Sequence, residues 1–175
     1  TPKPSSAASD VYKRQGWVHL LAERMRQEGF EHRVVNASIS GDTSAGGAAR
    51  LPALLTEHQP QLVIVELGGN DGLRGLPPGQ LQQNLASMID ASRGAGAKVL
   101  LLGMRIPPNY GERYTTAFAK VFDDVAADKN VPLVPFLLEG VGGVDKLMQD
   151  DGVHPAVEAQ PQLLENVWPT LKPLL

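Results

Sequence analysis

Three short apolar runs, separated by amphipathic segments, limit the fold of this chain more than any other feature of its sequence. Residues 62–67, 97–103 and 131–135 are almost continuously apolar, as expected of strands that are covered on both faces. Residues 81–89 and 114–127 lie between these runs and carry apolar side chains at helical spacing. Strands that alternate with helices imply a parallel sheet with helices on both faces. We therefore predict an α/β fold in which residues 62–67 form a central strand.

The part of the chain before these runs adds two helices and one further strand. Apolar side chains recur at helical spacing from Trp17 to Met25, and Gly29 is a typical stop after such a helix. Residues 33–37 are predicted to form a short strand. The turn at residues 41–44 offers hydroxyls that can cap a second helix over residues 45–58.

The start of the chain does not share this pattern. Residues 1–14 (TPKPSSAASDVYKR) have no hydrophobic periodicity and lack the apolar stretch of a signal peptide. We interpret residues 1–15 as a tail that does not look native, and residues 16–175 as one domain. A chain of 175 residues, 42% of them hydrophobic, is long enough to bury a single core.

Composition excludes several classes of function. A formal charge of −3 provides no basic face of the kind that nucleic acid requires, so small or neutral substrates fit better. The absence of cysteine excludes disulfides, thiolate metal sites and a cysteine nucleophile. His19, His32 and His58 do not have the spacing of zinc ligands, so no metal site is expected. No apolar run is long enough to span a bilayer, and stable membrane insertion is not expected.

The polar loop near the C-terminus is the first candidate for chemistry. Asp151 precedes His154 by three residues in a loop made tight by Gly152 and Pro155. The carboxylate can then reach Nδ1 of the ring while Nε2 points outward, which is how a general base for hydrolysis is oriented. The alternative is an ordinary loop histidine with solvated neighbours, and Asp150 is interpreted as such a neighbour.

Two further loops offer hydrogen-bond donors. Asn70 follows Gly68 and Gly69, which let the backbone turn sharply and allow its side-chain amide to project over the edge of the sheet. Gly41 has no side chain to block its N–H, so it can supply a second donor to an oxyanion hole. In the alternative interpretation the glycines only turn the chain and Asn70 caps a loop.

Three segments together resemble a known family. Residues 36–43 (NASISGDT), 66–75 (ELGGNDGLRG) and 151–155 (DGVHP) look like blocks II, III and V of the SGNH (GDSL) hydrolases, nearest to the bacterial thioesterase I and arylesterase branch. The resemblance implies a flavodoxin-like three-layer α/β/α sandwich and serine ester hydrolysis without a metal or cofactor. It also implies a monomer that is periplasmic or secreted and that acts on small acyl esters or thioesters.

The resemblance assigns roles to individual residues. Gly41 and Asn70 would be oxyanion donors, His154 the general base and Asp151 its orienting partner. The loops that contain Leu73, Ile106 and Pro107 would line the acyl pocket, although ordinary loop packing is an alternative for these three residues.

One part of the family pattern is missing from this sequence. The family's first block, a buried strand followed by Gly-Asp-Ser, should precede Gly16, and its serine would fall near Pro4. No Gly-Asp-Ser occurs in the 175 residues, so no nucleophile is assigned, and none of Ser5, Ser6 and Ser9 is given this role. We therefore expect a sheet whose first strand is missing or replaced, with unpaired edges beside it.

This departure keeps two other functions open. One is a catalytically inactive, acyl-binding module with the same fold. The other is a flavodoxin-like signalling or nucleotide domain, which fits the strand and helix alternation but lacks a phosphate-cradling glycine motif after a first strand.

Overall fold

The computed structural model describes residues 15–175 and divides the chain into two compact units. The first unit comprises residues up to Asn36 together with Leu138–Pro169, and the second comprises Ala37–Leu137 together with Thr170–Leu175. The predicted tail over residues 1–15 and the predicted loss of the first strand lie outside the described residues, except for Gln15.

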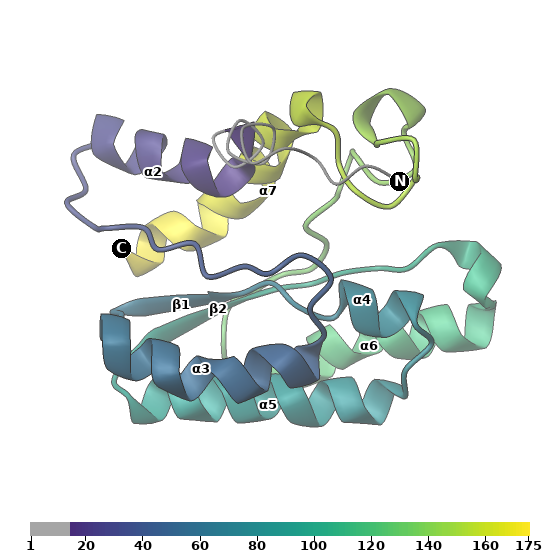
Figure 1. Cartoon of the computed structure of the whole chain (residues 1–175), viewed down its shortest axis with the longest axis horizontal. Coiled ribbons are helices and arrows are strands. Elements are labelled where there is room, and N and C mark those ends of the chain that lie inside the picture. Colours follow the sequence, from purple (N-terminus) through teal and green to yellow (C-terminus); the bar gives the residue numbers. More distant parts are fainter. Residues whose placement is uncertain (1–14) are drawn as a thin grey trace, which may run out of the picture. The chain divides into compact units, whose positions relative to one another are not determined.

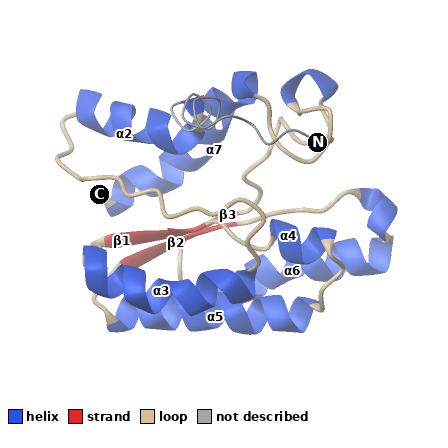
Figure 2. Cartoon of the chain, in the orientation of Figure 1, coloured by secondary structure: helices blue, strands red, loops and turns tan. Residues whose placement is uncertain are grey.

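The second unit contains a parallel sheet. Strands β1 (Leu62–Val65), β2 (Lys98–Leu102) and β3 (Leu133–Val134) are paired in the order β1-β2-β3, as Figure 2 shows. Leu62 pairs with Lys98, and Leu102 pairs with Val134, so all three carboxyl ends lie at the same edge. This confirms the predicted α/β class with a parallel sheet.

Helices of the second unit cover this sheet with apolar side chains. They are α3 (Ser44–His58), α4 (Gly69–Leu73), α5 (Pro78–Gly94) and α6 (Glu112–Lys129), with a 3-10 turn at Pro108–Tyr110. Helices α5 and α6 pack on β2, and α3 lies beside α5 (Figure 1). The core between them is completely buried, and each large apolar side chain in it contributes about 1.5–3 kcal/mol. Its largest members include Leu81, Leu85, Ile89, Leu101, Phe118 and Phe122.

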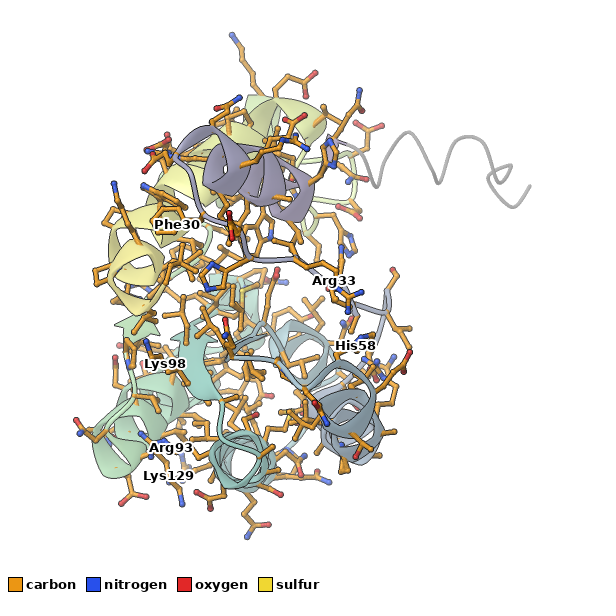
Figure 3. All side chains as sticks on the ribbon, turned by 90° about the vertical axis from the view of Figure 1, so that its left-hand side faces the viewer. Phe30, Arg33, His58, Arg93, Lys98 and Lys129 are labelled. Carbon is orange, nitrogen blue, oxygen red and sulfur yellow. The ribbon has the colours of Figure 1, made fainter. Side chains whose placement is uncertain are left out.

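Polar side chains hold the elements together at the amino end of the sheet. Lys98, at the start of β2, donates to the carbonyl of Leu174 at 3.0 Å. Arg93, in the last turn of α5, donates to the carbonyl of Asn130 at 2.9 Å. Figure 3 labels both basic side chains. These bonds join the amino end of the sheet to the helix ends around it.

The first unit is built on two helices, α2 (Trp17–Gln27) and the greater part of α7 (Gln160–Leu171). The backbone N–H of Trp17 donates to the side chain of Gln160 at 2.9 Å. The guanidinium of Arg24 forms an ion pair with Glu165 and lies 4.6 Å from the ring centroid of Trp168. The helix predicted from the spacing between Trp17 and Met25 is confirmed.

Two predictions about strands are wrong. Residues 33–37 form no strand, and Val35 remains 43% exposed. Two β-branched residues favour a strand locally, but a ladder also depends on a neighbouring strand that lies far away in sequence. Within residues 15–175, β1 is an edge strand and not the predicted central one, since β2 is its only partner there. The apolar run at residues 62–67 was a sound signal for a strand, but it carried no information about the order of the strands.

Candidate active site

The segment around His154 is a tight hairpin. Met148 and Pro155 form an antiparallel bridge, and the N–H of Gln149 donates to the carbonyl of His154 at 2.8 Å. The N–H of Gly152 closes the turn by donating to the Gln149 carbonyl at 2.8 Å. Gly152 has a φ of +66°, a conformation that glycine adopts at little cost.

This hairpin aligns the imidazole through Asp151. One carboxylate oxygen of Asp151 accepts the backbone N–H groups of Val153 (2.9 Å) and His154 (3.0 Å). The other carboxylate oxygen lies 2.6 Å from Nδ1 of His154. An aspartate that binds the backbone two and three residues ahead is held in one rotamer, so the ring that it contacts is held as well.

Hydrogen bonding also favours the ionised form of Asp151. The backbone N–H of His154, its side chain and the backbone N–H of Val153 lower the pKa of Asp151 from 3.8 to about 2. The carboxylate is therefore ionised near neutral pH, and the proton of a neutral His154 ring is assigned to Nδ1. Nε2 is then the basic nitrogen. It has no hydrogen-bond partner within residues 15–175, and the side chain is 59% exposed.

The two predicted donors lie in the second unit, on neighbouring segments. Gly68, at a φ of +113°, ends the short connection between β1 and α4, and Asn70 lies in the first turn of this short helix. The side-chain amide of Asn70 donates to the carbonyl of Asp42 at 3.0 Å, which brings it to the segment that follows Gly41. An amide has two N–H groups, so one remains for another acceptor.

Gly41 presents an open N–H group. Its φ is +80°, in a turn closed by the N–H of Asp42, which donates to the Ile39 carbonyl at 3.2 Å. No acceptor for the N–H of Gly41 is found in the described part of the chain. Nothing lies within 4 Å of the position that a Cβ on Gly41 would occupy, so the space beside it is open.

Two arginines that sequence reasoning missed hold this segment. Arg50 donates twice to the Asp42 carboxylate, at 3.0 and 2.8 Å, and once to the Ala37 carbonyl at 3.1 Å. Arg74 donates to the Gly41 carbonyl at 3.0 Å. No spacing rule links Arg50 or Arg74 to a turn that lies eight or more residues earlier in the chain, so the sequence carried no signal for either contact.

The three predicted pocket residues differ in burial. Leu73 is half-buried, and its carbonyl accepts the Tyr110 hydroxyl at 3.1 Å. Ile106 is only 8% exposed and belongs to the apolar core, whereas Pro107 is half-buried. Their contact with an acyl group stays a prediction.

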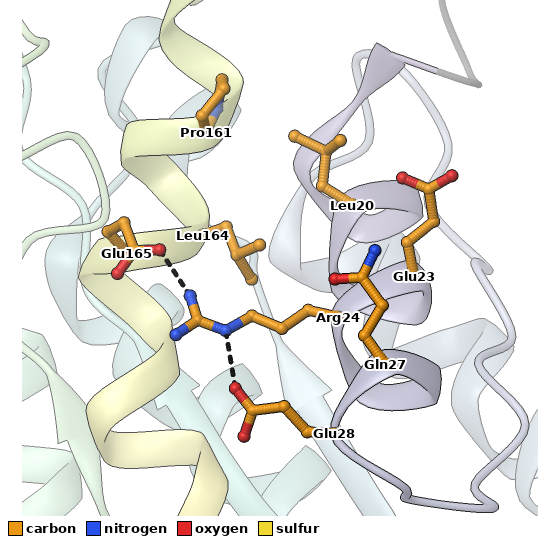
Figure 4. A pocket seen from close by; sticks show the side chains of 8 residues that line it. All are labelled: Leu20, Glu23, Arg24, Gln27, Glu28, Pro161, Leu164 and Glu165. Carbon is orange, nitrogen blue, oxygen red and sulfur yellow. Dashed lines mark hydrogen bonds and ion pairs between the residues drawn. The ribbon is translucent and has the colours of Figure 1, made fainter.

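A groove in the first unit does not involve any predicted site residue. It has a volume of about 420 Å³, lies between α2 and α7, and is shown in Figure 4. Arg24 crosses it and pairs with Glu28 and Glu165. Its three carboxylates, of Glu23, Glu28 and Glu165, outnumber the single guanidinium, and none of the residues that line it belongs to the predicted site.

Residues 15–175 contain no group of three or more histidine, aspartate or glutamate side chains placed to hold a metal ion. In the same range no helix combines the length and the apolar character needed to cross a membrane.

Hydrolases that act on ester bonds typically combine an aligned histidine with amide donors for an oxyanion. This chain has a carboxylate-aligned histidine, amide donors beside tight turns, and a parallel sheet. The chain belongs to the GDSL-like lipase/acylhydrolase family, whose family model matches residues 5–160. This membership confirms the resemblance to the SGNH (GDSL) hydrolases.

Individual relatives agree with this membership. The chain is 67% identical to the esterase TesA of Pseudomonas aeruginosa, over 97% of its own length and 85% of that protein. It is 47% identical to thioesterase 1/protease 1/lysophospholipase L1 of Escherichia coli K12, over 91% of this chain and 75% of that one. A crystal structure of TesA superposes with a TM-score of 0.91 at 68% identity, covering 93% of this chain and 90% of that chain.

Proposed function

We propose that this protein hydrolyses small acyl esters and thioesters by a serine-hydrolase mechanism. In this mechanism His154 is the general base, Asp151 aligns it, and Gly41 and Asn70 donate to the oxyanion. The observation that carries the proposal is the 2.6 Å contact between Asp151 and Nδ1 of His154, with Nε2 open. A structural histidine gains nothing from an exposed, unpartnered Nε2, whereas a general base requires it.

The first half of the reaction forms an acyl-enzyme. A serine hydroxyl attacks the substrate carbonyl and transfers its proton to Nε2 of His154. The carbonyl oxygen becomes an oxyanion that accepts hydrogen bonds from Gly41 and Asn70. As the tetrahedral intermediate collapses, the imidazolium of His154 returns the proton to the leaving alcohol or thiol. In the second half, water takes the place of the serine hydroxyl and releases the acid.

The charges of the described residues suit these steps. The Asp151 carboxylate lies against the ring that becomes positively charged, so it stabilises the imidazolium. The neutral N–H donors stabilise negative charge without giving up a proton, and loss of one such donor commonly costs about 2.7–4 kcal/mol of transition-state stabilisation.

The attacking serine is assigned by family pattern only. In this family it belongs to a Gly-Asp-Ser motif, which does not occur in the 175 residues. Ser5, Ser6 and Ser9 lack the motif and are not proposed as nucleophiles. A catalytically inactive, acyl-binding protein is the corresponding second candidate.

The substrate class follows from the same assignment. Leu73, Ile106 and Pro107 are apolar and suit an acyl chain better than a charged group. The net charge of −3 does not suit nucleic acid. We expect a monomer without a cofactor that works in the periplasm or outside the cell, which cell fractionation with an antibody to the chain would test.

Two proteins test the mechanism. One is the 175-residue chain, and the other is the same chain with residues 1–14 replaced by a first block of the family pattern, a buried strand followed by Gly-Asp-Ser. We expect the second protein to release p-nitrophenol from short-chain p-nitrophenyl esters and thiol from acyl thioesters. His154→Ala should lower kcat by about 10³-fold or more, and Asn70→Ala by about 10²–10³-fold.

His58→Ala is the matched control, because His58 is a partly exposed histidine at the end of α3, and the pair with Glu57 is the only polar interaction of its side chain among the described residues. It should leave kcat unchanged. Binding of a fatty acid without turnover in either protein would favour the inactive acyl-binding module. Turnover that survives His154→Ala would contradict the proposed mechanism.

A further inference from the structure

A buried polar cluster joins the two segments that carry the proposed oxyanion donors. Ser44 is fully buried at the start of α3, and Asp71 is 2% exposed in α4. The backbone N–H of Ser44 donates to one carboxylate oxygen of Asp71 at 2.7 Å, and its hydroxyl donates to the other at 2.6 Å. The side chain of Asn84, from α5, donates to the Ser44 hydroxyl oxygen at 2.9 Å.

The direction of each bond in this cluster is fixed. A serine hydroxyl has one proton, and a carboxylate only accepts. Because Asn84 donates into the oxygen of Ser44, the hydroxyl proton is directed to Asp71. The carboxylate therefore receives two donors from a single residue, and this pair of bonds restricts both the distance and the angle between the two segments.

Burial makes this cluster costly to rearrange. A buried carboxylate that loses a donor is penalised more than an exposed one, because water does not replace the lost bond. The other links between these segments are nearer the surface: Arg74 is exposed, and Asn70, which donates to the Asp42 carbonyl, is half-buried. The Asp71 cluster is thus the most rigid link between α4 and the turn that precedes α3.

The proposed donors are close to this link in the chain. Asn70 directly precedes Asp71, and Gly41 lies three residues before Ser44. The bond from Asn70 to the Asp42 carbonyl runs between the same two segments. A shift of Asp71 relative to Ser44 therefore changes the spacing between the N–H of Gly41 and the amide of Asn70.

We propose that Asp71, oriented by Ser44 and Asn84, is a positioning residue that sets the separation of the two oxyanion donors. The inference rests on the proposed function only for the roles of Gly41 and Asn70. The positioning itself is a property of the second unit, and a measurement that needs no turnover tests it. Asp71 does not contact substrate in this account; it acts through Asn70 and the turn at Gly41.

The first experiment is ¹⁵N–¹H NMR on the 175-residue chain. Ser44→Ala removes the hydroxyl link, and Asp71→Asn removes a carboxylate that accepts two bonds. Both should shift or broaden the side-chain NH₂ pair of Asn70, assigned with Asn70→Ala, and the backbone amide of Gly41.

Ser92→Ala is the matched control. Ser92 is also a fully buried helical serine, but its hydroxyl donates to the carbonyl of Met88 within α5, at 2.8 Å. It should leave both sets of resonances in place. Unchanged resonances of Asn70 and Gly41 in folded Asp71→Asn would overturn the proposal. If Ser44→Ala and Asp71→Asn do not fold, Asn84→Ala provides the test, because it removes only the outer hydrogen bond to Ser44. It should shift the resonances of Asn70 and Gly41 in the same way but less. If Asn84→Ala causes no such shifts, the proposal is overturned.

The second experiment is kinetic and uses the hydrolytically active protein defined above. Ser44→Ala should lower kcat by about 10–100-fold with little change in KM, because the donors act on the transition state and small misplacements are costly. If the role of Ser44 were purely structural, Ser44→Ala would lower the melting temperature without a selective loss of kcat at nearly constant KM. If the parent protein shows no turnover, the proposed function fails while the NMR result still decides the positioning role.

Discussion

At the scale of single residues, the hydrogen bonds of Asp151 explain why a surface carboxylate and a surface histidine stay together. Exposed ion pairs usually contribute little, since two long side chains must be ordered to form them. Here the carboxylate is already fixed by two backbone N–H groups, so only the imidazole remains to be ordered. The pair is held by its local backbone rather than by burial.

The pKa of Asp151 gives the first prediction at this scale. A pKa of about 2, below the ordinary 3.8, means that Asp151 favours the folded loop above pH 4 and loses this contribution as the pH falls through about 2. The strongest cause is the backbone N–H of His154, which a side-chain substitution retains. We therefore expect His154→Ala to raise the pKa of Asp151 only partly, to a value still below 3.8.

The measurement is a ¹³C NMR titration of the Asp151 carboxyl carbon in both proteins, assigned with Asp151→Asn. A return of the pKa to 3.8 in His154→Ala would show that the imidazole, and not the backbone, holds the carboxylate.

At the scale of elements, close packing around α4 fixes where Asn70 stands. A Cβ added to Gly72 would lie 2.4 Å from Cγ2 of Ile106 and 2.8 Å from the ring of Phe118. The helix can therefore approach the core only because residue 72 has no side chain. The contact between Gly72 and Ile106 joins α4 to the loop after β2 and has no sequence signature.

Gly72→Ala is the prediction at this scale. We expect it to destabilise the protein by about 1–3 kcal/mol, since it overfills a packed core. Thermal denaturation should show a melting temperature lower by about 2–4 °C for each kcal/mol. Gly79→Ala is the control, because Gly79 lies in α5 with nothing within 4 Å of the added Cβ. Equal stability of Gly72→Ala and Gly79→Ala would contradict this account of the packing.

At the scale of the whole molecule, patterns that depend on neighbours in sequence were predicted well. The spacing of apolar residues placed α2 and α6 within two residues of their observed bounds, and the capping turn placed α3 within one. The same spacing located α5 but made it three residues too short at its start and five at its end. The carboxylate of Asp151 contacts His154, as the three-residue spacing predicted. Properties that depend on partners far away in sequence were not predicted. They include the order of the strands, the absence of a strand at residues 33–37 in the described structure, and the arginines that hold the segment at Gly41.

The arrangement of the sheet predicts an order of hydrogen-exchange rates. Strand β2 is paired on both edges, and Val99 to Leu102 are at most 3% exposed, whereas Leu62, Val63 and Ile64 of β1 are only half-buried. We expect the amides of β2 to exchange most slowly and those of β1 to exchange measurably faster. Hydrogen exchange followed by mass spectrometry or NMR would check this order. Equally slow exchange in β1 would mean that a further strand pairs with its other edge.

The hairpin around Gly152 has one more consequence. All the hydrogen bonds that orient the imidazole come from residues 149–154, so these six consecutive residues align His154 with Asp151. We therefore expect the hairpin to keep its internal geometry when it is transplanted between two antiparallel strand ends of an unrelated protein. Substitutions elsewhere in the chain would then change the position of the hairpin, but not its internal hydrogen bonds.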